Sequence, residues 1–225
     1  MLALLVFVMT GCAGQMQIDT KTTIKTAAGA GALTLKVSGT GLVGEALRNG
    51  NLDQYIAGAN TAGMSVRRYI EGEQAVLEVG GTFSSVDELN ALQKEAFAPL
   101  GIVPSFTRSQ RNSFFSSSTS YQVSFDSPSE TPDANIESSS QSSQSASANL
   151  TPDIILRYDL TVPGKVTSTN AVVRDGTTLT WTLSAGQVLS NSTLDATSRQ
   201  SHPERILGIV LTGCLAVFLV RRRLA

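Results

Sequence analysis

The sequence predicts an α+β domain with a mostly antiparallel sheet and two or three helices, followed by a C-terminal transmembrane helix. Three observations lead to this prediction. Segments in which hydrophobic and polar residues alternate recur along the chain, as half-buried strands require. The segments that follow residues 40 and 85 instead space their hydrophobic residues as helices do. Finally, hydrophobic runs occupy both ends of the chain, at 1–9 and 206–220.

The first strand is expected within 15–26, where Met16, Ile18 and Ile24 share one parity. Residues 32–38 repeat the alternation and predict a hairpin partner. The hydrophobic period lengthens over 40–59, which predicts helices that break near Asn49-Gly50. Strands follow at 64–70 and 75–83, and Gly80-Gly81 in the second strand indicates a bulge or a close backbone approach.

Ser85 and Glu88 have the spacing of a capping box, so a helix is expected to begin there and to end at Pro99 and Gly101. Residues 110–126 are polar but extended, with Phe115, Tyr121, Val123 and Phe125 in one parity. The cleanest alternation lies at 154–162. Asp175-Gly176 then predicts a hairpin between 171–174 and 178–183.

Residues 127–150 are rich in Ser, Gln and Asn, so they offer few hydrophobic groups to offset the entropy cost of ordering. We therefore expect a disordered insertion here, within one exported domain formed by 12–126 and 151–190. Two separate domains are less favoured, because the few strands after the insertion would have little core of their own. Residues 191–204 are polar and predict a tether to the membrane.

The hydrophobic N-terminal run stops at a small residue, Gly11, directly before Cys12. This pattern predicts a lipoprotein signal peptide at 1–11, whose removal leaves Cys12 acylated on its thiol. No Lys or Arg precedes the run, which departs from the usual signal. An ordinary signal peptide, or a simple N-terminal anchor with an incidental cysteine, is the alternative.

Residues 206–220 carry no charge and would span roughly 22 Å as a helix, against a hydrocarbon core of about 30 Å. Flanking Arg205 and Arg221 can extend this span, because long basic side chains reach toward the headgroups. We expect a transmembrane helix at 205–221 and a cytoplasmic basic tail at 222–225. A buried core helix is the alternative. The two ends together predict a protein of the cytoplasmic membrane, lipid-anchored and single-pass, with its domain on the extracytoplasmic side.

Composition excludes several classes of function. The net charge is −1 and the pI about 5.8, so the chain has no basic footprint for nucleic acid. The two cysteines, Cys12 and Cys214, lie in the terminal segments, which leaves no disulfide for the domain between them. One histidine, His202, lies next to the predicted span, so neither a His/Cys metal site nor a Cys–His pair can form in the domain.

Two further sequence patterns could indicate a cofactor site or a catalytic site. The glycines of Gly39-Thr-Gly-Leu-Val-Gly44 have the spacing of a dinucleotide fingerprint, but that fingerprint needs a parallel βαβ unit. Because the alternation here predicts antiparallel strands, we interpret the glycines as a strand-to-helix turn. Asp87 and Glu88 are more simply charges at a helix N-terminus than an acid/base pair. We therefore predict neither a cofactor nor an enzymatic activity.

Several segments resemble the LppM-like domain family of bacterial envelope lipoproteins. The resemblance rests on Gly63-Met-Ser-Val-Arg-Arg-Tyr69, on Phe83-Ser-Ser-Val-Asp-Glu-Leu-Asn90, on Val162-Pro-Gly-Lys-Val166 with Asn170, and on Thr178-Leu-Thr-Trp-Thr-Leu183. It implies a lipobox cysteine, an α+β domain and a C-terminal transmembrane helix. It implies no catalytic residue and at most a link to envelope lipid or glycolipid binding. The long Ser-rich insertion departs from the family's compact form.

The leading functional hypothesis is a non-catalytic binding module for a lipid or envelope glycolipid at the membrane. Arg67, Arg68 and Tyr69 are the candidate ligand-binding residues, because two adjacent guanidinium groups beside an aromatic ring can hold an anionic headgroup. A solvated strand face is the plainer interpretation of the same residues. The alternative function is a structural protein that recruits an envelope protein partner. An enzyme ranks third, since no Asp and Glu residues can be placed together.

Overall fold

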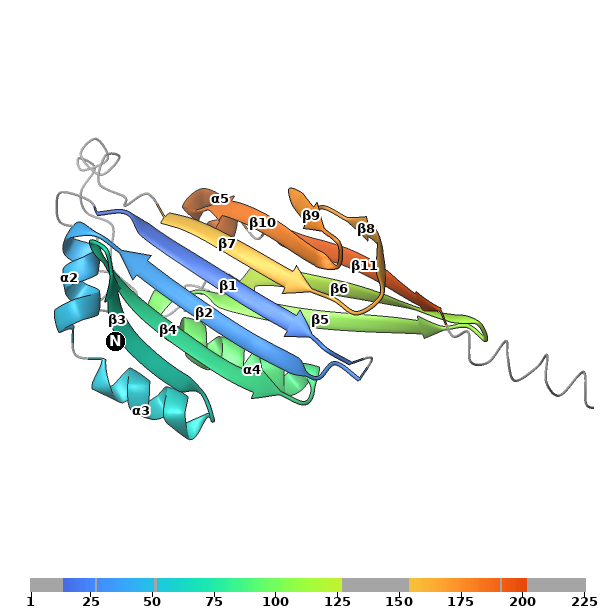
Figure 1. The fold of residues 1–225 in the computed structure, drawn as a ribbon, viewed down its shortest axis with the longest axis horizontal. Helices are drawn as coiled ribbons and strands as arrows, with labels where there is room; N and C mark the ends of the chain where they lie inside the picture. The colour runs from blue at the N-terminus through green and yellow to red at the C-terminus, as the bar shows by residue number, and fades with distance from the viewer. Residues whose placement is uncertain (1–13, 27, 51, 127–153, 191, 202–225) are drawn as a thin grey trace, which may run out of the picture.

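The computed structural model describes residues 14–26, 28–50, 52–126, 154–190 and 192–201. These residues form a seven-stranded sheet, one face of which is covered by a four-stranded sheet and by helices (Figure 1). The architecture is α+β with mostly antiparallel strands, as predicted. Four α-helices are described, against the two or three expected.

The seven-stranded sheet has the order β3-β4-β2-β1-β7-β10-β9. All neighbours in it are antiparallel except β1 and β7, which are parallel. Because β7 pairs with β1, the portions of chain before and after 127–153 build one sheet. The strands are β1 (Met16–Ile24), β2 (Gly31–Gly39), β3 (Ser65–Glu71), β4 (Gln74–Phe83), β7 (Ile154–Thr161), β9 (Val173–Asp175) and β10 (Thr178–Ser184).

The four-stranded sheet has the order β5-β6-β11-β8. Its strands are β5 (Val103–Asn112), β6 (Ser116–Asp126), β8 (Lys165–Thr169) and β11 (Thr193–Ser201). The predicted tether at 191–204 is therefore wrong for 193–201, because β11 pairs with both β6 and β8. Its buried residues are Leu194, Ala196 and Ser198, and this small, partly polar set gives a weak hydrophobic signal. The stretch 110–126 contains the end of β5, a turn and all of β6.

The helices are α2 (Gly41–Asn49), α3 (Asp53–Thr61), α4 (Val86–Phe97) and α5 (Ala185–Leu189), and a 3-10 turn follows α4 at Ala98–Leu100. The short α5 was not predicted. Helix α4 packs beside β5 and beneath β4 and β2. No helix within the described residues is long and hydrophobic enough to cross a bilayer. The predicted signal peptide at 1–11, the transmembrane helix at 205–221, the Ser-rich insertion and Cys12 all lie outside the described residues.

The cap of α4 differs in one bond from the predicted capping box. The Ser85 hydroxyl accepts from the Glu88 amide at 3.2 Å, as expected. The Glu88 carboxylate instead accepts from the amide of Ser84, at 2.6 Å, and from the Ser84 hydroxyl, at 2.7 Å. These two hydrogen bonds lower the pKa of Glu88 below its usual value. Glu88 thus helps to cap the N-terminus of the helix, as the simpler interpretation of its charge expected.

The core lies between the two sheets and α4, and it contains a small polar cluster. The Tyr158 side chain is fully buried; its hydroxyl shares a 2.9 Å hydrogen bond with the Thr22 hydroxyl and accepts from the Gln93 side-chain amide at 3.1 Å. Burial raises the pKa of Tyr158 to about 12, so the phenol stays neutral at physiological pH. The cluster therefore ties β1, β7 and α4 together without burying a charge.

Gly80 and Gly81 do not form a bulge, because the register between β2 and β4 continues through them without a shift. The close approach, which was the other interpretation, occurs at Gly81. A Cβ atom there would lie 3.1 Å from the Met64 side chain and 3.4 Å from that of Leu92. The absence of a side chain lets these two residues reach the sheet.

Candidate functional site

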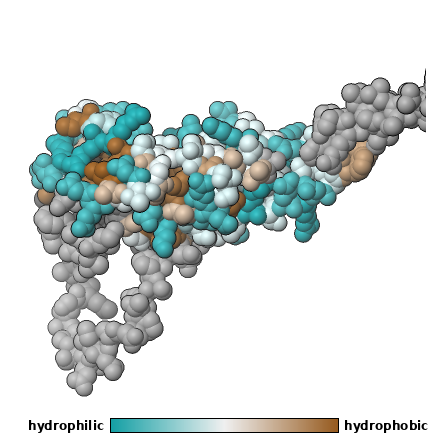
Figure 2. Space-filling model, turned by 90° about the horizontal axis from the view of Figure 1, so that it is seen from below, coloured by the Kyte–Doolittle hydropathy of each residue, from teal (hydrophilic) through white to brown (hydrophobic). Residues whose placement is uncertain are grey.

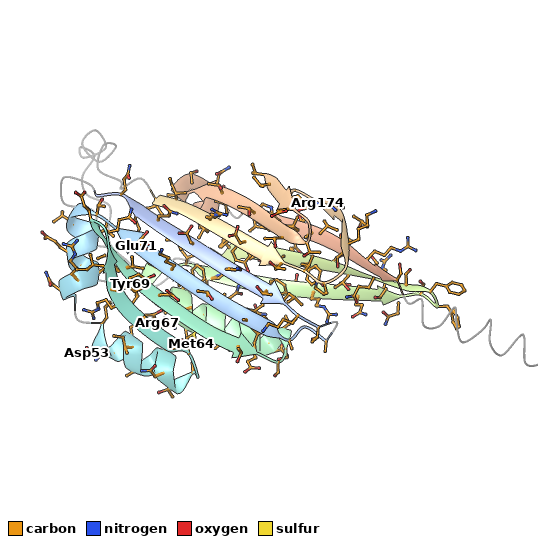
Figure 3. The ribbon with its side chains drawn as sticks, viewed as in Figure 1. Asp53, Met64, Arg67, Tyr69, Glu71 and Arg174 are labelled. Atoms are coloured by element: carbon orange, nitrogen blue, oxygen red, sulfur yellow. The ribbon has the colours of Figure 1, made fainter. Side chains whose placement is uncertain are left out.

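The predicted binding residues lie on β3, an edge strand of the seven-stranded sheet (Figure 3). In the register with β4, Arg67 lies opposite Glu78 and Tyr69 lies opposite Val76. Opposed residues of an antiparallel pair project from the same face, and neighbours along a strand alternate between faces. Arg67, Tyr69 and Glu78 therefore share the outer face of the sheet, which faces away from the core. The side chain of Arg68 leaves the strand on the opposite face.

Around this edge the surface is hollowed into an open depression of about 590 Å³, lined by Arg67, Arg68, Tyr69 and Glu78. All three predicted residues thus contribute to one depression. Glu78 was missed by the sequence reasoning, because only the strand register brings it beside Arg67. Figure 2, seen from below the view of Figure 1, shows hydrophilic and hydrophobic residues interspersed over the described surface.

Tyr69 is held in place by Glu78. Its hydroxyl donates to the Glu78 carboxylate at 3.1 Å, and the side chain remains 37 % exposed. Partial burial and the hydrogen bond to Glu78 both raise the pKa of Tyr69. The phenol therefore remains protonated at neutral pH.

The two arginines have different surroundings. Arg68 donates from Nη1 to the Arg48 carbonyl at 2.8 Å, at the C-terminus of α2, where a positive charge also complements the helix dipole. No hydrogen bond or ion pair joins Arg67 to another described residue, and its side chain is exposed. Arg68 thus positions β3 against α2, whereas the donors of Arg67 have no partner among the described residues.

Charges alternate across the outer face of the sheet. The strand registers place Arg67, Glu78, Lys36, Asp19 and Arg157 in one row across five strands. The Lys36 ammonium also lies 2.7 Å from the carboxylate of Glu71, which is outside the row, and this hydrogen bond raises the pKa of the lysine. Alternation neutralises the middle of the row, because each interior charge has opposite neighbours. An arginine stands at each end of the row and has one such neighbour. Arg157 also lies 3.3 Å from the Asp159 carboxylate, whereas Arg67 has no ion pair among the described residues, so positive charge is less compensated at the depression.

Among the described residues, no three His, Cys, Asp or Glu side chains are grouped so that they could hold a metal ion. The glycines at 39–44 join β2 to α2, and β2 is antiparallel to both β1 and β4. A Cβ atom at Gly44 would lie 2.7 Å from the Gly39 carbonyl oxygen. These glycines therefore permit close contact between strand and helix, as the strand-to-helix interpretation requires. His202 and Cys12 lie outside the described residues.

Comparisons with known proteins find similarity in structure. No protein-family model matches the chain, and no curated protein matches it. The chain is similar to the NMR structure of the folded domain of LppM from Mycobacterium tuberculosis, with 14 % sequence identity and a TM-score of 0.48. The match covers 87 % of this chain and 96 % of that one. LppM gives its name to the family that the motifs of this sequence resemble.

Proposed function

We propose that this chain is a membrane-anchored, extracytoplasmic lipoprotein whose domain binds the polar head of an envelope lipid or glycolipid without catalysis. The observation that carries the proposal is the depression at β3, where the exposed Arg67 has no partner among the described residues. Tyr69 and Glu78 lie beside it on the same face.

The three side chains have complementary chemistry for such a head. A guanidinium group offers a planar fork of donors that matches a phosphate or carboxylate. The half-exposed ring of Tyr69 offers an apolar face with a polar edge, and the Glu78 carboxylate can accept hydrogen bonds from hydroxyl groups. An anionic group next to hydroxyl groups is what the polar head of a phosphorylated glycolipid presents.

The predicted anchors fit a ligand that resides in the membrane. Strand β1 begins at one end of the domain and β11 finishes at the other (Figure 1). If Cys12 and 205–221 enter the same membrane, the domain lies lengthwise along it, and the end that carries the depression stays near the lipid surface.

Anchoring is tested by removing each end in turn. Cys12→Ala should abolish acylation but leave the protein in the membrane, because a spanning helix is effectively permanent. A chain that stops after Ser201, where β11 ends, should remain held by its acyl group and be extracted more readily. Membrane fractions washed at alkaline pH, followed by immunoblotting, measure both. If the chain that stops after Ser201 is released completely while the leader is still removed, Cys12 carries no lipid.

Ligand binding is tested with the full chain purified from its own host. Native mass spectrometry should detect a co-purifying lipid, and Arg67→Gln should lose most of it because the uncompensated donors are gone. Arg157→Gln is the matched control: it removes the same charge from the same sheet face, four strands away. Lipid that is retained equally by both variants, or absent from the unsubstituted protein, would contradict the proposal.

Recruitment of an envelope protein is the second candidate function. It is favoured by the two edge strands of the seven-stranded sheet, β3 and β9, where Ile70 is 62 % and Val173 is 55 % exposed. Edge strands can pair with another chain, because their outer backbone groups have no strand partner. The purification described above separates the candidates. A lipid-free protein that keeps one stoichiometric protein partner would favour recruitment.

A further inference from the structure

The turn between β5 and β6 presents two adjacent aromatic side chains to solvent. Phe114 is 57 % and Phe115 is 51 % exposed, and their rings meet edge to face with centroids 5.0 Å apart. The turn itself is tightly bonded. The Ser113 amide donates to the Ser116 carbonyl at 2.8 Å, and the Ser116 amide donates to the Ser113 hydroxyl at 3.2 Å. The two rings are therefore held on a defined turn.

This turn lies where the described chain leaves the domain. Ser201, the last residue of β11, pairs directly with Ser116, the first residue of β6 (Figure 1). The predicted transmembrane segment begins at Arg205. The short connection can extend at most about 3.5 Å per residue, or roughly 14 Å in all. If that segment spans the bilayer, the aromatic pair must therefore lie close to the bilayer surface.

The same end of the domain is positively charged. Arg111, Ser118, Arg199 and Lys165 lie opposite one another across β5, β6, β11 and β8, on the outward face of the four-stranded sheet. Arg199 also donates from Nε and Nη2 to the Ser116 hydroxyl, at 3.2 and 3.1 Å, which directs its guanidinium group toward the turn. The strand and turn residues nearest this end, 108–120, 163–169 and 197–201, contain no Asp or Glu. The end therefore complements a surface of anionic phosphates.

We propose that this tip is a third membrane contact, in which Phe114 and Phe115 enter the interfacial layer of the bilayer while Arg111, Arg199 and Lys165 meet anionic phospholipid headgroups. The inference rests on the C-terminal anchor of the proposed function. It goes beyond that function because it assigns a lipid contact to the folded domain itself. Exposed aromatic groups flanked by basic side chains favour the boundary between headgroups and acyl chains.

The test uses tryptophan fluorescence in the full chain, reconstituted in vesicles of phosphatidylcholine and phosphatidylglycerol. The chain has one tryptophan, Trp181, which is 3 % exposed and therefore gives a background that lipid cannot reach. Phe115→Trp adds a reporter at the tip, and Val172→Trp adds one at an exposed site in another region. Phospholipids brominated high on their acyl chains quench only a tryptophan that lies in the bilayer.

We expect the added emission of Phe115→Trp to shift to shorter wavelength and to be largely quenched, and that of Val172→Trp to be unchanged. Adding Arg111→Gln and Lys165→Gln should weaken quenching in vesicles that contain phosphatidylglycerol. The proposal is overturned if Phe115→Trp stays unquenched in protein that resists alkaline extraction. A blue shift without quenching would also overturn it and would indicate a protein partner at the tip. Protein that washes out at alkaline pH would instead show that the C-terminal anchor has failed.

Discussion

Trp181→Ala is expected to lower the free energy of unfolding by about 3–5 kcal/mol, a large share of the ~5–15 kcal/mol typical of a domain. Trp181 lies on β10 and is buried against the ring of Tyr158, with centroids 6.4 Å apart. Alanine would leave a cavity beside the polar cluster of the core. Urea unfolding of the full chain in detergent, followed by circular dichroism, measures the change, since the substitution removes the one tryptophan.

The indole also makes a hydrogen bond that couples the two sheets. Its Nε1 donates to the Asn170 side-chain oxygen at 2.8 Å, and that oxygen also accepts from the Asp195 amide at 2.8 Å. The Asn170 side-chain nitrogen donates to the Thr193 carbonyl at 2.8 Å. Asn170 thus links β10 of one sheet to β11 of the other. Asn170→Ala alone should cost about 1–3 kcal/mol, because it removes three hydrogen bonds that are each worth about 0.5–1.5 kcal/mol.

A double-mutant cycle measures how strongly Asn170 and Trp181 are coupled. If Asn170 acts partly through the indole, the double variant should lose less stability than the sum of the two single losses. The expected coupling is about 0.5–3 kcal/mol, the range for residues that share a hydrogen-bond network. Strict additivity would mean that Asn170 serves only the backbone of β11.

Strands with large side chains could be predicted from the sequence, because their buried and exposed positions differ strongly in chemistry. Strand β7 buries Leu156, Tyr158 and Leu160, and β10 buries Leu179, Trp181 and Leu183. Strand β11 has the same alternation of burial, but small and polar side chains occupy its buried face. A pattern of Leu, Ala and Ser does not distinguish a central strand from a polar linker.

Buried polar residues are the second feature that could not be predicted from the sequence. Thr20 and Thr22 lie in the same parity as Ile18 and are as deeply buried. The burial of Thr22 is tolerated because Tyr158 comes from a strand 136 residues away to share its hydrogen bond. Such pairing over long sequence separations leaves no local signal. Glu78 could not be predicted as part of the candidate site for the same reason, because its position beside Arg67 depends on the register of β3 and β4.

Phe115 shows a third limit of prediction from the sequence. It shares its parity with Tyr121, Val123 and Phe125, so a continuous strand would bury it with them. The Ser113–Ser116 turn interrupts that strand and leaves Phe115 at the exposed tip. Parity predicts burial only within one unbroken strand, and a turn made by four serine and phenylalanine residues lacks the usual Gly or Asn signal.

Gly44→Ala in α2 and Gly58→Ala in α3 are expected to change stability in opposite directions. Alanine has the higher helix propensity, so the substitution alone favours both helices by about 0.5–1 kcal/mol. At Gly58 a Cβ atom meets only a Glu95 carboxylate oxygen, at 3.9 Å, so this gain should be realised. At Gly44 it would lie 2.7 Å from the backbone oxygen of Gly39, which cannot rotate away.

Helix α2 must therefore move off the end of β2 in the Gly44→Ala protein, and overpacking of this kind costs about 1–3 kcal/mol. The movement reaches the candidate site, because the Arg48 carbonyl at the end of α2 accepts the hydrogen bond from Arg68. Urea unfolding and lipid retention, measured on both variants, should show both losses for Gly44→Ala and neither for Gly58→Ala. If Gly44→Ala were instead stabilising, close contact with β2 would not be the reason for glycine there. A Gly44→Ala protein that is destabilised yet keeps its lipid would mean that the depression does not depend on α2.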